Sequence, residues 1–373
     1  MRAADASFPA AASPAHLDAL TGIRGIAAWL VVLYHIRFSL LELLPIPVIK
    51  VLARGYLAVD LFFVLSGFVL WYNYAPRLRA GGAGAAGTFL WRRIARIWPL
   101  HLAVLSVLVA FALTLVVTGR DASFYPFSEL PLHLLLIQNW GFTDHLTWND
   151  PAWSISTEWM ASLLFPLVVL AAKWERTPTP VLLAVAGILL AAIPLFFWGA
   201  GNTSLGADIS HLGLGRCLFE FSLGNLLCLL WLRWRDQPLC PWLSLVACLG
   251  LLAAAYAWDL PETVFVPAAF VTGLMALATG RGPIVDVLSS RPLRYLGEVS
   301  YATYLAHTVL FLLFKLAFVD ASLKLDWLRF GAFLALVLAA SIFCYHGLEK
   351  PAQRWFNRHP PRWPLRANEV PAE

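Results

Sequence analysis

Two ionisable side chains, Arg24 and His35, lie within the first long apolar segment of the chain, LTGIRGIAAWLVVLYH. Eleven helical residues cover three turns plus about 20°, so both side chains face the same way, about 16 Å apart along the axis. An imidazole titrates near neutral pH and can serve as a general base. A snorkelling arginine and a structural histidine explain the spacing equally well, so the spacing alone favours neither interpretation.

Two carboxylates enter later apolar segments. Asp60 lies near the start of GYLAVDLFFVLSGFVLWYNY, where it can pair with a histidine or an arginine of a neighbouring helix. Ser66 lies in the middle of that segment, where a small residue more often serves close helix packing than chemistry. Glu158 lies about one and a half turns inside NDPAWSISTEWMASLLFP, at a depth comparable to that of His35, and we expect these two side chains to meet.

A pair of arginines opens another apolar segment. Arg93 and Arg96 in RRIARIWP are three residues apart and therefore project from the same face of a helix. Two guanidinium groups suit a phosphate group, and a lipid-headgroup anchor is the competing interpretation. The remaining polar side chains inside apolar segments are Arg216 and Glu220, which are spaced to pair, and Tyr301, Tyr304 and His307 in GEVSYATYLAH. The last three are interpreted as partners of a site or as packing residues, and packing is favoured for Tyr304.

The rest of the chain is strongly apolar. Of its 373 residues, 60% are hydrophobic and 13% are charged, whereas soluble domains contain about 25% charged residues. Lipid must therefore cover most of this surface. The net charge of +5 is spread over several loops, which does not indicate nucleic-acid binding. The five cysteines form no CxxC pair, so neither a disulfide framework nor a metal site is expected.

A membrane-spanning helix needs about 20 mostly apolar residues. Ten such segments are predicted, at residues 20–40, 56–74, 97–117, 154–172, 180–198, 212–232, 241–257, 263–279, 299–319 and 327–347. We therefore expect an all-α fold, a polytopic transmembrane helical bundle of about ten spans, within one membrane domain at 17–352. Residues 1–16 and 353–373 are predicted to form a disordered tail and a basic tail.

Two connecting segments have a distinctive composition. GGAGAAG at 81–87 is expected to be a flexible cytoplasmic linker before the third span, because glycine-rich segments behave as flexible coils. The apolar stretch 128–140 is too short to cross a membrane, so it is expected to re-enter the membrane or to lie at its interface.

The distribution of basic residues predicts the orientation of the bundle. With the N-terminus inside, the inner segments hold 18 lysines and arginines and the outer segments hold 6. An excess of basic residues on the cytoplasmic side is typical of membrane proteins, so both termini are predicted to be cytoplasmic.

Taken in order along the chain, these motifs resemble those of acyltransferase family 3, a family of multi-pass membrane O-acyltransferases. The similarity is carried by RGIAAWLVVLYH with Arg24 and His35, GYLAVDLFFVLSGF, RRIARIWP with Arg93 and Arg96, WSISTEW with Glu158, and GEVSYATYLAH. It extends over nearly the whole chain, from residue 17 to residue 352.

The resemblance implies an enzyme of the cytoplasmic (inner) membrane, in contact with membrane lipid. It implies acyl-CoA, by default acetyl-CoA, as the donor substrate on the cytoplasmic side, and no permanently bound cofactor. The acceptor would be a hydroxyl of a carbohydrate or a glycan-containing molecule. Some members carry an additional esterase-like domain outside the membrane, which we do not expect in this chain. The resemblance leaves open whether the protein forms a homo-oligomer and whether a separate partner protein completes the transfer.

Acyl transfer from a thioester to a hydroxyl needs a base and stabilisation of the developing oxyanion. His35 is expected to act as the general base or to become acylated as a relay. Glu158 or Asp60 is expected to orient its ring. Arg24 is expected to contact the oxyanion or a pyrophosphate of the coenzyme.

Binding of the coenzyme needs cations at the cytoplasmic mouth of the site. Arg93 and Arg96 are expected to bind its phosphates, with Arg24 deeper along the same path. Ser66 is placed with these coenzyme-binding residues.

A secondary transporter or flippase is the alternative function, because it would also place arginine, histidine and carboxylates inside about ten helices. Transporters often contain two related halves. The sequence contains no second copy of RGIAAWLVVLYH or of RRIARIWP, which disfavours a transporter.

The predicted orientation can be tested with reporter fusions along the full chain. Fusions after Arg79 and after Arg235 are expected to report a cytoplasmic location, because both follow spans that end in basic inner segments. A fusion after Asp144 is expected to report an external location. A cytoplasmic signal from the Asp144 fusion would contradict the predicted topology.

Overall fold

The computed structural model of the chain describes residues 15–319 and 324–361, and these residues form helices without any strand. The expected all-α fold is therefore confirmed. Nine helices in this part of the chain are long and apolar enough to cross a membrane. The long helices are α1 (Ala15–Ile36), α3 (Ala58–Val117), α5 (Ala152–Ala171), α6 (Thr179–Gly199), α7 (Ile209–Trp234), α8 (Cys240–Trp258), α9 (Glu262–Thr279), α12 (Ser300–Phe318) and α13 (Trp327–Cys344).

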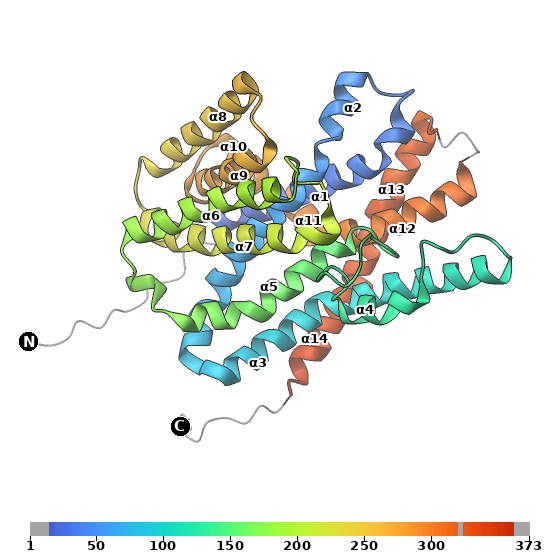
Figure 1. The fold of residues 1–373 in the computed structure, drawn as a ribbon, viewed down its shortest axis with the longest axis horizontal. Coiled ribbons are helices and arrows are strands. Elements are labelled where there is room, and N and C mark those ends of the chain that lie inside the picture. The colour runs from blue at the N-terminus through green and yellow to red at the C-terminus, as the bar shows by residue number, and fades with distance from the viewer. Residues whose placement is uncertain (1–14, 320–323, 362–373) are drawn as a thin grey trace, which may run out of the picture.

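The longest helix, α3, accounts for the difference between nine helices and ten predicted spans. It contains both the second and the third predicted span, and it bends at Gly82, whose φ of 55° and ψ of −136° are not helical. Figure 1 shows α3 folding back on itself in the lower left of the view. A positive φ suits glycine, which has no Cβ. The expected flexible linker at 81–87 is wrong, because this stretch continues the two helical arms and only Gly82 departs from them.

Short helices fill the connections between the long ones. They are α2 (Ile46–Leu52), α4 (Leu130–Leu135), α10 (Pro283–Leu288), α11 (Arg291–Glu298) and α14 (Lys350–Arg358). Helix α4 lies within the stretch 128–140, and its six residues are too few to cross a membrane, as predicted.

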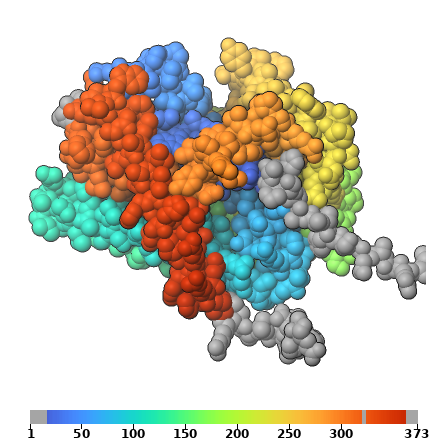
Figure 2. Space-filling model, turned by 180° about the vertical axis from the view of Figure 1, so that it is seen from behind, coloured from blue at the N-terminus to red at the C-terminus, as the bar shows by residue number. Residues whose placement is uncertain are grey.

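The C-terminal part of the described chain packs against α3. Residues 353–358 of the predicted basic tail belong to α14, and the indole nitrogen of Trp91 donates a hydrogen bond of 2.9 Å to the carbonyl oxygen of Phe356. Figure 2 shows this red segment lying against the blue and cyan surface of α3. The predicted tail at 1–16 falls outside the described residues up to residue 14, and α1 begins at Ala15.

Glycines allow the central helices to approach closely. A Cβ built on Gly67 of α3 would lie 2.0 Å from the carbonyl oxygen of Phe221 in α7, and one on Gly224 of α7 would lie 1.9 Å from that of Val64. Helices in lipid associate through such small residues, since lipid gives them little hydrophobic reason to associate. The motif Ser66-Gly67 therefore contributes packing through its glycine, while its serine faces a cavity described below.

Helix α1 runs through the interior of the bundle. It packs against α3, α9, α10, α11 and α12. A Cβ on Gly22 would lie 1.9 Å from the carbonyl oxygen of Leu288 in α10, and one on Gly297 of α11 would lie 1.8 Å from that of Thr21. The helix that carries Arg24 and His35 is thus held on several sides by neighbouring backbone.

Candidate active site

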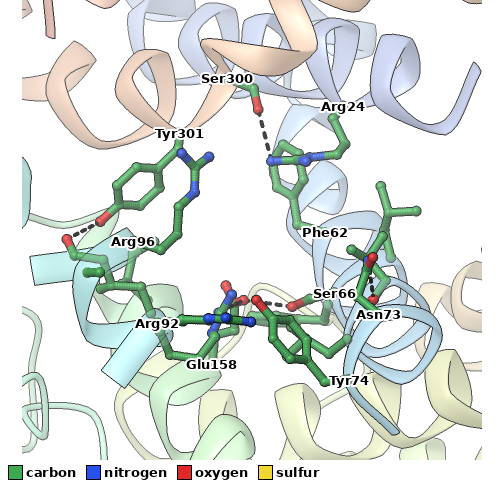
Figure 3. Close-up of a pocket in the computed structure, with 18 of the residues that line it drawn as sticks. Arg24, Phe62, Ser66, Asn73, Tyr74, Arg92, Arg96, Glu158, Ser300 and Tyr301 are labelled. Carbon is green, nitrogen blue, oxygen red and sulfur yellow. Dashed lines mark hydrogen bonds and ion pairs between the residues drawn. The ribbon is translucent and has the colours of Figure 1, made fainter. Parts of the chain in front are cut away.

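A cavity of about 390 Å³ opens beside the N-terminal half of α1. We call it the arginine cavity, because its lining includes five arginines, Arg24, Arg77, Arg92, Arg93 and Arg96. Figure 3 shows how side chains from α1, α3, α5 and α12 surround this space. The volume lies in the range of about 300–1,000 Å³ that is typical of small-molecule sites.

The charges around the arginine cavity do not balance. Glu158 is the one carboxylate in the lining, and Glu349 contacts Arg96 from behind. Two carboxylates face five guanidinium groups, so the described residues leave a surplus of positive charge. Arg24 has no ion-pair partner among these residues, and its Nη2 donates to the hydroxyl of Ser300 at 3.4 Å. Such a surplus favours an anionic ligand, and guanidinium groups match phosphate oxygens well.

Glu158 lies in the arginine cavity and not beside His35. Its Oε1 accepts a hydrogen bond of 2.5 Å from Nη2 of Arg93 and one of 2.6 Å from the hydroxyl of Ser66. The Nε of Arg93 also donates to the hydroxyl of Ser162, at 3.2 Å. The expected contact between Glu158 and His35 is therefore wrong, and the carboxylate instead fixes Arg93 and Ser66.

Arg96 is held by a residue that the sequence did not single out. Its Nη1 donates to Oε2 of Glu349 at 2.6 Å, and its guanidinium lies 5.2 Å from the centre of the Tyr301 ring. The Tyr301 hydroxyl donates to the carbonyl oxygen of Ile97 at 2.7 Å. As expected from their spacing, Arg93 and Arg96 line the same cavity. Glu349 was missed because it follows the last predicted span, where a glutamate is usually a solvent-exposed residue.

A second cavity of about 350 Å³ lies beside the C-terminal half of α1. We call it the histidine cavity, because His35 contributes to its lining together with Tyr34, Tyr56, Asp150, Trp153, Ser204 and Arg216. Val59 and Tyr304 line both cavities. The two spaces thus meet at these two side chains, and α1 places Arg24 in one and His35 in the other.

His35 contacts a second histidine on α12. Its Nδ1 lies 2.9 Å from the carbonyl oxygen of Val31 and 3.1 Å from Nε2 of His307. His307 is completely buried, and its Nδ1 lies 2.7 Å from the carbonyl oxygen of Tyr304. The sequence left open whether His307 is a partner of a site or a packing residue, and the structure places it against His35.

Asp150 is the carboxylate that lines the histidine cavity, and the sequence did not single it out. Burial raises the pKa of Asp150, and the nearby His35 opposes this shift. The signal in the sequence that could have identified Asp150 is a carboxylate just before a predicted membrane span.

Asp60 pairs with an arginine, which was one of the two alternatives that the sequence left open. Nε and Nη2 of Arg216 donate to Oδ1 and Oδ2 of Asp60, both at 2.6 Å, and neither residue is more than 1% exposed. The pairing with Glu220 that the spacing allows does not form, since both carboxylate oxygens of the buried Glu220 lack a hydrogen-bond partner among the described residues. Asp60 therefore does not orient the ring of His35 by direct contact.

Two residues that line the histidine cavity, Tyr56 and Ser204, hydrogen-bond to Glu262, the first residue of α9. Its carboxylate accepts hydrogen bonds from the Tyr56 hydroxyl at 2.5 Å, the Leu205 amide at 2.7 Å and the Arg54 guanidinium at 2.8 Å. The hydroxyl of Ser204 donates to it as well. This carboxylate ties the segment that precedes α3 to the segment that precedes α7.

An all-helical membrane bundle with an arginine-lined cavity and an imidazole in an adjoining one has the features of a membrane acyl-transfer enzyme. A family model described as acyltransferase domain matches residues 17–346, and the chain belongs to this acyltransferase family. It is therefore an integral, multi-pass membrane enzyme that transfers acyl groups other than aminoacyl groups. The alternative of a transporter or flippase is not retained.

Several curated proteins are similar to the chain. The acyltransferase MdmB of Streptomyces mycarofaciens is 30% identical over 78% of both chains. The exopolysaccharide production protein ExoZ of Rhizobium meliloti is 28% identical over 80% of this chain and 90% of its own. The peptidoglycan O-acetyltransferase OatA of Listeria monocytogenes is 24% identical over 78% of this chain and 49% of its own. No solved structure matches the chain.

The ion pair between Asp60 and Arg216 predicts a pattern of stability. Asp60→Leu or Arg216→Met alone is expected to lower the free energy of unfolding by about 3–5 kcal/mol, because each leaves one buried charge unpaired. The double variant is expected to recover most of this loss, since no unpaired charge is then left by the pair. Thermal unfolding of the purified protein in detergent measures both effects. An Asp60→Leu protein that is as stable as the wild type but inactive would instead place Asp60 in the chemistry.

Proposed function

We propose that the protein transfers an acyl group, acetyl by default, from acyl-CoA to a hydroxyl of a carbohydrate or glycan-containing acceptor. The observation that carries this proposal is the pair of adjoining cavities, one with surplus arginine and one with His35. Each cavity suits one of the two substrates, and their shared residues, Val59 and Tyr304, mark where the reacting groups would meet.

The arginine cavity suits the donor. Coenzyme A carries several phosphate charges, which the guanidinium groups of Arg92, Arg93 and Arg96 can neutralise through charge-assisted hydrogen bonds. Arg24 forms no ion pair with a described residue. Among the arginines that line this cavity, it is the one that belongs to α1, the helix that also carries His35. It is therefore available to a pyrophosphate or to the carbonyl oxygen of the thioester. The predicted orientation places this cavity on the cytoplasmic side, where acyl-CoA is made.

The histidine cavity suits the acceptor. Aromatic rings of Tyr34, Tyr56 and Trp153 line it together with the carboxylate of Asp150. Aromatic faces and hydrogen-bond acceptors are both useful for binding a sugar that carries many hydroxyl groups. Two relatives support an acceptor of this kind, since one is named a peptidoglycan O-acetyltransferase and another an exopolysaccharide production protein. We place the enzyme in the cytoplasmic (inner) membrane.

The reaction needs one proton transfer and one exchange of bonds at the thioester carbon. In direct transfer, His35 takes the proton of the acceptor hydroxyl, the oxygen bonds to the carbonyl carbon, and the carbon–sulfur bond breaks. The proton then passes to the coenzyme thiolate. In a relay, Nε2 of His35 first bonds to the carbonyl carbon while the carbon–sulfur bond breaks and the coenzyme leaves as its thiolate. The acceptor oxygen then displaces the imidazole from the acyl carbon, and the proton of the acceptor hydroxyl passes to the thiolate. Both routes use the same imidazole.

The donor site can be tested by measuring release of free coenzyme A from acetyl-CoA by the purified enzyme with extracted surface glycan as acceptor. Arg93→Ala and Arg96→Ala are each expected to raise KM for acetyl-CoA about tenfold or more, the equivalent of one charge-assisted hydrogen bond. The KM for the acceptor is expected to change little. Arg281→Ala is the control, because Arg281 is exposed and lines neither cavity.

Arg93→Lys separates a coenzyme site from a simple lipid anchor. It is expected to recover only part of the affinity, because lysine lacks the planar fork of arginine. If both alanine variants bind the coenzyme as the wild type does, the two arginines do not form the donor site.

The role of His35 can be tested with His35→Asn, which keeps a hydrogen-bonding side chain but has no useful proton affinity near neutral pH. Turnover is expected to fall at least about a hundredfold, the lower bound for general base catalysis. Coenzyme affinity is expected to stay near that of the wild type, since His35 does not line the arginine cavity. A folded His35→Asn enzyme with most of its turnover would rule out His35 as base and relay.

A further inference from the structure

The hydrogen bonds around His35 and His307 define where each proton lies. The carbonyl oxygens of Val31 and Tyr304 can only accept, so Nδ1 of His35 and Nδ1 of His307 must each carry a hydrogen. A neutral His307 then has an unprotonated Nε2, which accepts from Nδ1 of His35 at 3.1 Å. The two rings are consistent with a single pair of tautomers.

This pair of tautomers leaves one free lone pair, on Nε2 of His35. No described residue forms a hydrogen bond with that nitrogen. The nitrogen is also not fully enclosed by the protein, so it is accessible. Since His35 lines the histidine cavity, Nε2 is the ring atom available to a ligand there. A flip of the ring would replace Nδ1 by a carbon and lose both hydrogen bonds.

We propose that His307 is a positioning residue for acyl transfer, which holds the ring of His35 so that Nε2 faces the acceptor hydroxyl. This inference rests on the proposed function of His35. Val31 belongs to α1 itself and moves with His35, whereas His307 comes from α12 and fixes the ring relative to the rest of the cavity. When Nε2 of His35 takes the acceptor proton, the hydrogen bond from Nδ1 to His307 becomes charge-assisted and therefore stronger.

The competing role for a completely buried histidine is packing between helices. The two roles differ in which nitrogen of His307 matters. Packing and the bond to Tyr304 need the volume of the ring and the donor at Nδ1. Positioning needs the acceptor at Nε2, because that is the atom of His307 that forms the hydrogen bond with His35.

Two amide variants separate these nitrogens. The amide of His307→Gln reaches the position of Nε2 and offers an acceptor to His35. The amide of His307→Asn reaches the position of Nδ1, so it keeps a donor for Tyr304 but leaves His35 without its partner. His101→Leu is the matched control, since His101 is also buried and bonds to a carbonyl oxygen, of His133, but lines neither cavity.

Turnover of acetyl-CoA with extracted glycan is measured for each full-length variant, together with KM for acetyl-CoA and the thermal unfolding midpoint. We expect His307→Asn to lower kcat about tenfold or more, the scale of one charge-assisted hydrogen bond. His307→Gln is expected to recover at least a third of the wild-type kcat, with KM for acetyl-CoA within about twofold of wild type in both. In the His35→Asn background, His307→Asn is expected to cause no further loss, because it acts through His35.

Equal kcat values in the Gln and Asn variants would overturn the inference and leave His307 a packing residue. If His307→Asn does not fold, His307→Met replaces it, because methionine fills a similar volume without an acceptor for His35. The parallel His35→Asn measurement separates the two proposals. A fully active His35→Asn would overturn the proposed function, whereas an inactive His35→Asn with equal Gln and Asn variants would overturn only the role of His307.

Discussion

Asp60 and Arg216 join α3 to α7 through two hydrogen bonds of 2.6 Å, in a place where neither side chain is more than 1% exposed. A charge in such surroundings is tolerated only with a partner, so the pair fixes the rotation and depth of both helices. Arg216 faces the histidine cavity, and Ser66, six residues beyond Asp60, faces the arginine cavity. The placement of both cavities therefore depends on this interaction.

The two cavities use charge in opposite ways. Around the histidine cavity most charged groups are paired within the protein, as in the cluster of donors that surrounds Glu262. Around the arginine cavity the guanidinium groups outnumber the carboxylates, and Arg24 has no ion-pair partner among the described residues. Unbalanced positive charge within a membrane protein is costly, which is why it marks a place where an anion is expected to bind.

The sequence predicted the helices well, because hydropathy over about 20 residues is a strong signal of a membrane span. It also found the arginines and His35, since ionisable residues in apolar segments are easy to recognise. It did not predict the partners correctly. Glu158 was matched to His35 by depth, but depth does not define which neighbour a helix faces, and Glu158 contacts Arg93 instead. The sequence also left His307 undecided, because its role depends on a contact between α1 and α12.

Among the described residues, Val59 and Tyr304 are the two whose side chains line both cavities, so they form the layer between two polar recesses. A membrane voltage falls mainly across such a layer, where it is worth about 2.3 kcal/mol per elementary charge for each 100 mV. In the proposed reaction, the proton that leaves an acceptor in the histidine cavity and reaches the coenzyme thiolate from the arginine cavity would cross part of this field. Under the proposed function, the rate of acyl transfer is therefore expected to depend on the membrane voltage.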